Sequence, residues 1–324
     1  MVNQNDRAKP YCLDTRYSTT QIVVNFPPVV QQQADSKFQF LLQLPEGESR
    51  QSTGGLRTNG IYKCTLPDKP LITINTAVFN GASTIEDTIK SVLGQTYTNV
   101  EYIVIDGGST DGTQEIIRKY EGSIDYWLSE PDLGVYDAMN KGLALASGEV
   151  IGFLNADDVY MHSDVLSKVA STISDPAIDA CYADLVYVDR KKTSRVLRYW
   201  ISRDYMPGLF EKGWMPAHPT FFVRKVVYEK FGGLDLRYRL QADFDLALRF
   251  MGIHGIQTRY VPEIWVRMKM GGMSNNSICN VVSGNIEAYS ACRNNGLNVS
   301  PWFILTKMLS RVPQFIRARR IKLD

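Results

Sequence analysis

This 324-residue sequence has few histidines, no paired cysteines, no long apolar run and almost no net charge. The five cysteines are scattered without a CxxC pair, which indicates reduced thiols in a cytoplasmic compartment and not a disulfide framework. A net charge of +2 provides no global field for nucleic acid. The polar start, MVNQNDRAKPYCLD, does not resemble a secretory signal, and no apolar run reaches the roughly 18 residues of a membrane span. We therefore expect a cytoplasmic protein that does not bind nucleic acid.

Changes in composition and pattern divide the chain into four segments. The first is rich in Gln, Ser, Thr and Asn, and we expect an extension with a few strands that serves as a sheet edge or as the arm of a homodimer. The second alternates strands and helices, the third has longer strands followed by helices, and the last is a set of helices with a basic amphipathic tail. The predicted boundaries are 1–66, 67–175, 176–280 and 281–324.

The second segment has a regular strand–helix alternation. Apolar runs suited to buried strands, each followed by a polar loop and a helix pattern, occur at 71–79, 100–105, 124–129 and 149–154. This spacing predicts an α/β fold with a mostly parallel sheet and helices on both faces. Farther along, 178–189 and 194–200 are predicted to form an antiparallel pair, with helices from about 225 and over 242–252. Sheets of this kind bind ligands beyond the carboxyl ends of their strands.

Acidic residues follow the ends of these strands: Asp106, Asp111, Asp132, Asp157 and Asp158. Any one of them could simply cap a helix. Together on one rim they would repel one another unless a cation or hydrogen-bond donors compensate. Hard divalent cations prefer carboxylate oxygens, and Mg²⁺ usually takes one or two carboxylates together with substrate phosphates. The rim therefore predicts a site for a metal ion and a diphosphate.

These motifs, in this order, resemble a known family. The run ITINTAVFNGASTIEDTIKSVLGQTYTNVEYIVIDGGSTDGT, followed by SEPDLGVYDAMNKGLALASGEVIGFLNADD, is similar to the nucleotide-sugar-binding half of family 2 glycosyltransferases of the GT-A fold. The resemblance resumes at HPTFFVRK (218–225), GGLD (232–235) and ADFDLALR (242–249). It implies a GT-A, Rossmann-like, mixed but mostly parallel sheet flanked by helices, and it does not include 1–66.

The resemblance assigns the donor contacts. Residues around Thr76, Val78 and Asn80 would line the nucleoside pocket, and Asp106 would accept a hydrogen bond from the base, usually uracil. Asp132 would lie near the base or the ribose. On the helix that follows, the implied contacts are Tyr136, Asn140 and Lys141; the alternative for the last two is a solvated helix face.

The NADD stretch aligns with the DxD-type element of the family. Asp157 would reach a Mn²⁺ or Mg²⁺ ion between the two phosphates, and Asp158 would position metal-bound water or the sugar. Asn155 replaces the first acid, so it keeps an acceptor oxygen but loses a charge. With Ala156, these residues complete the implied nucleotide-sugar site.

A catalytic base is implied in the second half of the family. Asp243, preceded by Ala242 where other members carry Glu, would deprotonate the acceptor hydroxyl, and direct displacement would invert the anomeric centre. A helix N-cap is the alternative for Asp243. His218 lies in a loop that the family places beside the donor phosphates or the acceptor; it is also a candidate metal contact, or a structural histidine. Trp214 could stack on a sugar ring or simply pack, and Asp245 is a further candidate contact with the acceptor or the phosphates.

Two further stretches leave alternatives open. The Gly-rich stretch 268–276 could close over the donor or form an ordinary turn. In the tail, apolar residues recur every three or four positions from Leu305 to Ile316, and six Lys/Arg face one Asp over 301–324. This pattern indicates a helix at a membrane interface, through 301–322, or a helix packed on the protein itself. Pro313 is expected to break it.

The expected function is inverting, metal-dependent transfer of a hexosyl or N-acetylhexosaminyl group from a UDP-sugar to a glycan or lipid-linked acceptor. Such an enzyme would build a polysaccharide in the cytoplasm, at the inner face of the membrane. Asn155 motivates the alternative of a non-catalytic nucleotide-sugar-binding protein. A sugar nucleotidyltransferase is disfavoured because TAVFNGAST lacks the Gly- and Arg-rich loop after the first strand. A nicotinamide-dependent enzyme is disfavoured because DGGSTDG follows the second strand and is not GxGxxG.

Overall fold

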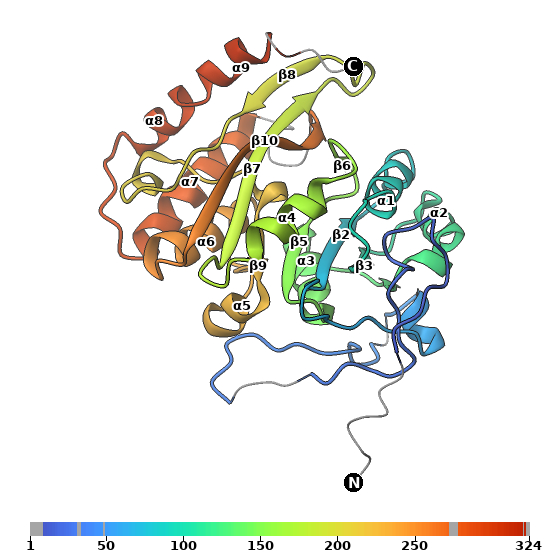
Figure 1. The fold of residues 1–324 in the computed structure, drawn as a ribbon. Helices are drawn as coiled ribbons and strands as arrows, with labels where there is room; N and C mark the ends of the chain where they lie inside the picture. Colours follow the sequence, from blue (N-terminus) through green and yellow to red (C-terminus); the bar gives the residue numbers. More distant parts are fainter. Residues whose placement is uncertain (1–8, 31–33, 48, 272–277, 320, 322–324) are drawn as a thin grey trace.

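The computed structural model describes residues 9–30, 34–47, 49–271, 278–319 and 321 (Figure 1). One mixed sheet of ten strands runs through them, in the order β1-β4-β3-β2-β5-β9-β7-β10-β6, with β8 paired to β7. One side of the sheet is the predicted parallel set, which lies in the order β4-β3-β2-β5. Its strands are β2 (Ile72–Val78), β3 (Val100–Asp106), β4 (Tyr126–Ser129) and β5 (Val150–Phe153). The carboxyl ends of these strands meet at one edge, as the alternation predicts.

The second half of the chain extends the same sheet with mostly antiparallel pairs, through β7 (Ala180–Val188), β8 (Val196–Trp200), β9 (Phe222–Arg224) and β10 (Thr258–Lys269). The short β6 (Asp158–Tyr160), from the end of the parallel half, pairs with β10 at the far edge. The hairpin of β7 and β8 confirms the predicted antiparallel pair. β10, which runs parallel to β7, was not predicted, because Pro262 and charged residues interrupt its apolar pattern; Pro262 lies where the register shifts against β7.

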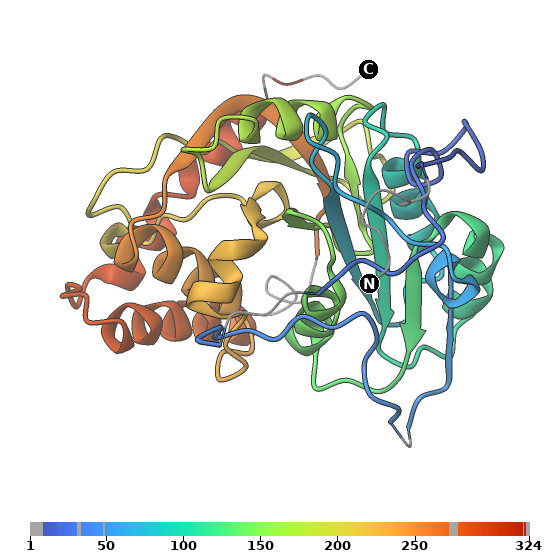
Figure 2. The ribbon, with the colours of Figure 1, turned by 60° about the horizontal axis from the view of Figure 1, so that its bottom comes forward.

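Helices cover both faces of the sheet (Figures 1 and 2). One core cluster joins one face to α1 (Ile85–Leu93), α2 (Thr113–Lys119) and α4 (Val165–Ile173). The other joins the opposite face to α3 (Val135–Leu145), α5 (Lys225–Phe231), α6 (Ala242–Ala247) and α7 (Ile278–Asn294). Alternate residues of β3 divide between them, with Ile103 and Ile105 in one cluster and Tyr102 and Val104 in the other. This alternation follows from the two-residue period of a strand.

The N-terminal segment attaches to the parallel half through a short strand and buried ion pairs. β1 (Ser52–Gly54) pairs antiparallel with β4 of the same chain, which agrees with the predicted sheet edge; the predicted homodimer stays untested. Arg57 forms an ion pair of 2.6 Å with Glu101, and Lys63 lies 3.7 Å from Asp125. The Arg57 guanidinium also donates to the Leu145 carbonyl at the end of α3. These contacts fix the segment to β4 and to the starts of β3 and β4.

The tail forms two short helices, α8 (Phe303–Leu309) and α9 (Val312–Ala318). The break predicted at Pro313 falls just before it, at Ser310 and Arg311, and Pro313 lies in the first turn of α9. α9 packs against β8 (Figure 1). Within the described residues, no helix combines the length and hydrophobicity needed to span a bilayer. Of the Gly-rich stretch, Met268 and Lys269 end β10, whereas 272–276 lie outside the described residues.

Candidate active site

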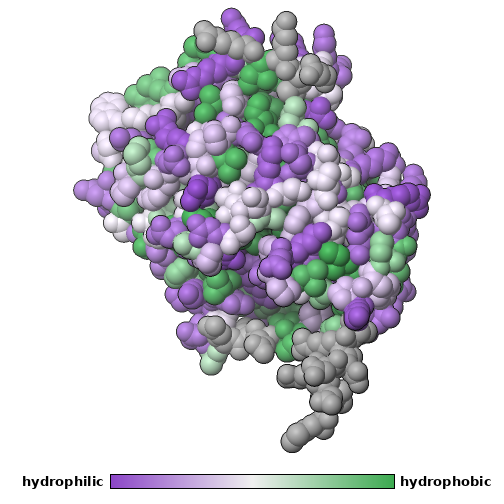
Figure 3. Space-filling view, in the orientation of Figure 1, coloured by the Kyte–Doolittle hydropathy of each residue, from purple (hydrophilic) through white to green (hydrophobic). Residues whose placement is uncertain are grey.

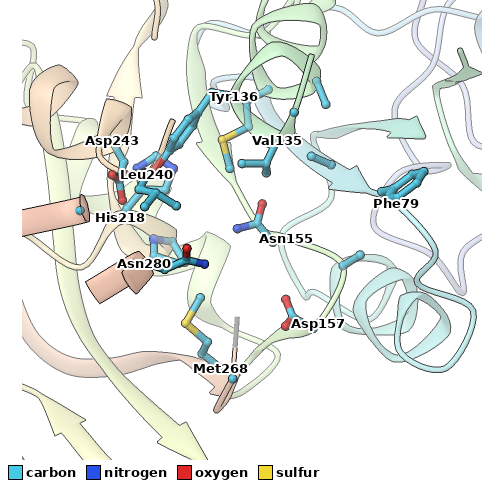
Figure 4. Close-up of a pocket in the computed structure, with 18 of the residues that line it drawn as sticks. Phe79, Val135, Tyr136, Asn155, Asp157, His218, Leu240, Asp243, Met268 and Asn280 are labelled. Atoms are coloured by element: carbon cyan, nitrogen blue, oxygen red, sulfur yellow. Dashed lines mark hydrogen bonds between the residues drawn. The ribbon is translucent and has the colours of Figure 1, made fainter. Parts of the chain in front are cut away.

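A cavity of about 710 Å³ opens at the carboxyl ends of the parallel strands. Figure 4 shows its residues converging from two sides: Phe79, Asn155 and Asp157 from the parallel half, and His218, Leu240 and Asp243 from the second half. Many of the residues predicted for a site line it, namely Val78, Asn80, Asp132, Tyr136, Asn155, Ala156, Asp157, His218 and Asp243. The strand order places the loops after β2, β4 and β5 at one edge, as expected for a doubly wound sheet.

The loop after β2 forms one end of the cavity. Asn80 has a left-handed backbone with φ 49°, which asparagine tolerates better than most residues. Its backbone N–H donates to the Ser109 hydroxyl, and its side-chain oxygen accepts the Thr110 N–H at 3.0 Å. Phe79, which was not predicted, is 66% exposed at the rim. These hydrogen bonds join the loop after β2 to the loop after β3, next to the exposed ring of Phe79.

The loop after β4 contributes Asp132 and the start of α3. Asp132 accepts the Gly134 N–H at 2.8 Å, and burial raises the pKa of its carboxyl group. The Leu133 N–H donates to Asp137, so a side chain already satisfies this N–H group at the start of α3. Asp132 and Tyr136 nevertheless line the cavity.

The stretch Asn155–Asp158 connects β5 to β6 and carries oxygen atoms that lack partners. In the described part of the chain, the Asn155 side-chain oxygen and both Asp158 carboxylate oxygens are buried without a hydrogen bond. Burial raises the pKa of Asp157, although Arg190 and Lys269 act against it. Burial and the neighbouring Asp157 raise the pKa of Asp158 well above its usual range. Such unpartnered oxygens are costly and are the ligands that a divalent cation prefers.

Several predicted residues lie outside the cavity lining. Thr76 donates to the Leu154 carbonyl at 2.6 Å, which joins β2 to the end of β5. Asp106 is fully buried and accepts hydrogen bonds from the Ser109 N–H, the Ser109 hydroxyl and the Ser129 hydroxyl. Asp158 is fully buried and does not line the cavity.

Asn140 and Lys141 on α3, each predicted to contact the ligand or to lie on a solvated face, do not line the cavity. The Asn140 side chain exchanges hydrogen bonds with the backbone of Leu234, at 2.8 and 3.0 Å. Lys141 forms ion pairs with Glu130 and Asp137. These side chains bind neighbouring protein groups and so do not form a freely solvated face; their contact with a ligand stays a prediction.

Asp243 lies at the start of α6 and is held by two hydrogen bonds. Its carboxylate accepts hydrogen bonds from the Tyr136 hydroxyl at 3.0 Å and from the Phe244 backbone N–H at 2.9 Å. His218 is 7% exposed, stacks on Phe153 and has a buried Nε2 with no partner in the described structure. Burial lowers the pKa of His218, although Asp243 acts in the opposite direction, so the imidazole is neutral at pH 7. In Figure 4, His218 lies near Asp243 and apart from Asp157.

Trp214 and Asp245 do not line the cavity. Trp214 packs against Tyr205, Phe210 and Tyr182. Asp245 forms a 2.8 Å ion pair with Arg249 and accepts an N–H from Asn295. Both contacts place these side chains in the packing around α6.

The cavity also contains side chains that were not predicted, from the β7–β8 hairpin, from the segment before α6, and from the α8–α9 junction. Its cationic residues are Arg190, Arg198, Arg239 and Arg311, and Tyr187 and Trp200 accompany them. The available signal in the sequence was Arg198 next to two aromatic residues, Tyr199 and Trp200. Among described residues, no cluster of three or more His, Cys, Asp or Glu side chains could hold a metal ion without other ligands.

Comparison with known proteins agrees with this geometry. The profile of glycosyl transferase family 2 matches residues 73–232. A PGL/p-HBAD biosynthesis glycosyltransferase of Mycobacterium tuberculosis is 32% identical over 210 residues, which cover 64% of this chain and 80% of that protein. An uncharacterized glycosyltransferase of the same species is 34% identical over 186 residues, which cover 56% of this chain and 68% of that protein.

Two solved structures show the same fold. The mannosyltransferase PcManGT from Pyrobaculum calidifontis, in complex with GDP-Man and Mn²⁺, gives a TM-score of 0.55 at 19% identity, over 77% of this chain and 74% of that chain. Residues 1–349 of S. aureus TarS in complex with UDP give 0.51 at 15% identity, over 70% and 67%. The fold is GT-A, with the mixed sheet and C-terminal helices that the sequence predicted. The cavity, the family match and the mycobacterial relatives agree, and the chain belongs to glycosyl transferase family 2.

Proposed function

We propose that this glycosyltransferase moves a sugar from a nucleotide-sugar donor, with UDP-sugars favoured, to a hydroxyl group of a glycan or lipid-linked glycan, with inversion. The transferred group would be a hexosyl or N-acetylhexosaminyl unit. One observation carries the proposal: Asp157, after β5, and Asp243, at the start of α6, line the same cavity from different halves of the chain. That arrangement offers one carboxylate to a donor diphosphate site and another to an acceptor hydroxyl.

The donor end would be formed by the loops after β2 and β4. Phe79 and Asp132 line this end, and an exposed ring beside a carboxylate suits a base and a ribose. Asp106 is fully buried, does not line the cavity and already accepts three hydrogen bonds, so its contact with the base stays a prediction. The UDP bound to TarS and the GDP-Man bound to PcManGT support a nucleotide at this end.

A divalent cation fits the stretch after β5. Asp157 would hold Mn²⁺ or Mg²⁺, with the unpartnered oxygens of Asn155 and Asp158 beside it. The ion would neutralise charge on the leaving diphosphate. Because so few carboxylates are present, the remaining ligands would be water and phosphate oxygens, which is the usual arrangement for Mg²⁺. The Mn²⁺ in the PcManGT complex supports this assignment.

The chain's own residues supply the proton transfer. Asp243 would take the proton of the acceptor hydroxyl, and the hydrogen bonds from Tyr136 and Phe244 both end on Oδ1, so that Oδ2 is left for the acceptor. The neutral His218 can hydrogen-bond the same hydroxyl or a neighbouring one through Nε2. Attack from the side opposite the leaving diphosphate would invert the anomeric centre.

The α8–α9 surface supports a contact with the cytoplasmic face of a membrane. Trp302, Leu309 and Ile316 are more than half exposed there, and Arg317 and Arg319 are exposed nearby. Figure 3 shows hydrophobic and hydrophilic side chains interleaved over the molecular surface, including this upper edge. Apolar side chains beside cations favour an anionic lipid surface. The double variant Leu309→Ser/Ile316→Ser should lose co-sedimentation with phosphatidylglycerol vesicles, whereas Val282→Ser, at an exposed apolar position on α7, should not.

The catalytic proposal is tested with donor panels and variants. With Mn²⁺, the protein should bind UDP or a UDP-sugar in calorimetry, and EDTA should abolish transfer. Asp243→Asn should keep donor binding and lose transfer by about 10²-fold or more, whereas the exposed Asp204→Asn should change neither. Product configuration, read by NMR, should be inverted. Donor binding without transfer to any acceptor would indicate the non-catalytic nucleotide-sugar-binding protein instead, and retained transfer by Asp243→Asn would contradict the base assignment.

A further inference from the structure

Two arginines in the cavity lack a carboxylate partner. Arg198 lies on β8 and Arg311 immediately precedes α9, and both line the cavity. Arg198 is only 6% exposed. Among the described residues, no Asp or Glu oxygen lies within the 4.0 Å ion-pair distance of either guanidinium. Buried charges are normally paired, so two unpaired guanidiniums in one cavity require an explanation.

The Arg198 side chain is held rigidly. Its guanidinium lies 4.9 Å from the Tyr187 ring centre and 5.0 Å from that of Trp200. Its Nε donates to the Gln314 side-chain oxygen at 2.7 Å. That bond uses one of the five N–H donors of an arginine, so the terminal nitrogens stay available for a planar oxyanion. Stacking and one hydrogen bond therefore orient this fork before any ligand binds.

Electrostatics favour an anion between these residues. Arg198 lies beside the start of α9, since its Nε donates to Gln314 and Arg311 is the residue just before that helix. Burial and the charge of Arg311 both lower the pKa of Arg198. Burial also lowers the pKa of Arg311, against the opposite effects of Tyr187 and Asp243. An anion would relieve the repulsion and accept charge-assisted hydrogen bonds.

The position of the pair separates it from the proposed diphosphate site. Successive cross-strand partners connect Asp158 on β6, Met268 on β10, Tyr187 on β7 and Arg198 on β8. Neighbouring strands are about 4.8 Å apart, so the Arg198 backbone lies roughly 14 Å from that of Asp158. A different cation, Arg190, acts on Asp157, whereas Arg311 lies within the field of Asp243. The pair is therefore at the end of the cavity where the acceptor would enter.

We propose that Arg198 and Arg311 form a subsite for an oxyanion, a phosphate or a carboxylate, carried by the acceptor. Assigning the anion to an acceptor rests on the proposed function, but the anion site itself does not. Arg311 also connects the cavity to the exposed apolar residues of α8 and α9, such as Leu309 and Val312. An acceptor whose anionic group is the phosphate of a lipid would therefore reach the pair from a membrane surface, whereas a soluble acidic sugar would enter from solution.

The test is anion binding with UDP and Mg²⁺ in excess to fill the donor end. Glucose 1-phosphate, glucuronate and dodecyl phosphate serve as probes, with glucose as the neutral control. Arg198→Gln and Arg311→Gln should each weaken anion binding by about tenfold or more. Arg195→Gln, an exposed change on the same hairpin, should leave it unchanged. Arg198→Lys, which keeps the charge but not the fork, should lose affinity while retaining the fold.

The outcomes are distinct. Anion affinity that is equal in wild type, Arg198→Gln and Arg311→Gln overturns the subsite, as does glucose binding as tightly as its phosphate. If dodecyl phosphate binds more tightly than glucose 1-phosphate and glucuronate, the anion belongs to a lipid. If the two soluble probes bind as tightly as dodecyl phosphate, the anion belongs to an acidic sugar. UDP binding, measured separately in the same variants, tests the proposed function. If the wild-type protein does not bind UDP, the proposed function is wrong, but the anion affinities still test the arginine subsite.

Discussion

The Tyr136 hydroxyl donates a hydrogen bond of 3.0 Å to the Asp243 carboxylate, across 107 positions of sequence. The bond joins the first turn of α3, in the parallel half, to the first turn of α6, in the second half. It is a direct polar link between the two sides of the cavity, and it fixes the carboxylate that we propose as the base. Burial, followed by the charge of Asp243, raises the pKa of Tyr136 well above its usual range, so the phenol remains a donor.

Tyr136→Phe should lower kcat by about tenfold and leave the affinity for the donor within about twofold, because an oriented base matters in the transition state and not for donor binding. Steady-state kinetics with calorimetry of UDP-sugar binding would measure both. Tyr289→Phe, outside the cavity, is the matched control. An unchanged kcat would show that the hydrogen bond does not position Asp243.

Asp158→Asn should stabilise the metal-free protein at pH 8 by about 1–3 kcal/mol, because it removes a buried charge without partners. Because the pKa of Asp158 is raised in the folded state, the folded protein holds this proton more tightly than the unfolded chain does. The wild-type protein therefore loses stability as pH rises above the ordinary carboxyl value of 3.8. The gain should therefore shrink at pH 5. Urea unfolding in EDTA, with Asp204→Asn as control, measures it, and a less stable Asp158→Asn at pH 8 would contradict the prediction.

Binding of Mn²⁺ in the presence of UDP should weaken on acidification sooner than at an ordinary carboxylate site. Burial raises the pKa of both Asp157 and Asp158, so protons compete with the metal at higher pH. Calorimetry from pH 8 to pH 5 would detect the loss, and Asp157→Asn should abolish binding throughout. Asp157→Asn with wild-type affinity would remove this residue from the metal site.

Glu101→Gln should destabilise the fold by about 3–5 kcal/mol at pH 7, because it leaves the buried Arg57 without its counter-charge. Burial alone would raise the pKa of Glu101, but Arg57 and hydrogen bonds from Ser147 and Thr73 outweigh it and lower the value. The contribution is thus present above the usual pKa of 4.5 and lost as pH falls through the folded value. The variant's deficit in urea unfolding should shrink in acid, and the exposed Glu115→Gln should differ from wild type by under about 0.5 kcal/mol.

Lys307→Met should stabilise the protein by about 1–3 kcal/mol at pH 7. Lys307 is 2% exposed beneath α6, where Nζ donates to Gln241 at 2.9 Å and lies 4.5 Å from the Phe244 ring centre. Burial lowers its pKa from 10.5 to about 7. Wild-type stability should therefore rise between pH 7 and 10.5, and the advantage of the variant should vanish over that range. Thermal unfolding at pH 7 and pH 10 measures this, with Lys212→Met as control; a destabilised Lys307→Met at pH 7 would show that the cation is favourable there.

The sequence by itself determined the parallel half and its rim. The apolar runs that became β2 to β5 are continuous because both faces of those strands are buried, and each is followed by a polar loop and an amphipathic helix. The carboxyl ends of parallel strands must meet at one edge, so the strand pattern alone assigns Asn155 and Asp157 to a common site. Asp243 was assigned through the family motif, and the structure brings it to the same cavity.

Only the tertiary structure decided which residues form the Arg198–Arg311 end of the cavity and which contacts several motif residues make. β10 has an interrupted pattern, and its place beside β7 depends on contacts across about 80 positions that no local signal encodes. Arg198 and Arg311 converge only because α9 packs on β8, and their distance in sequence hides the pair. Asn140, Lys141 and Asp245 fit the motif but contact backbone or opposite charge, because a polar group inside a packed fold must first satisfy its nearest neighbours.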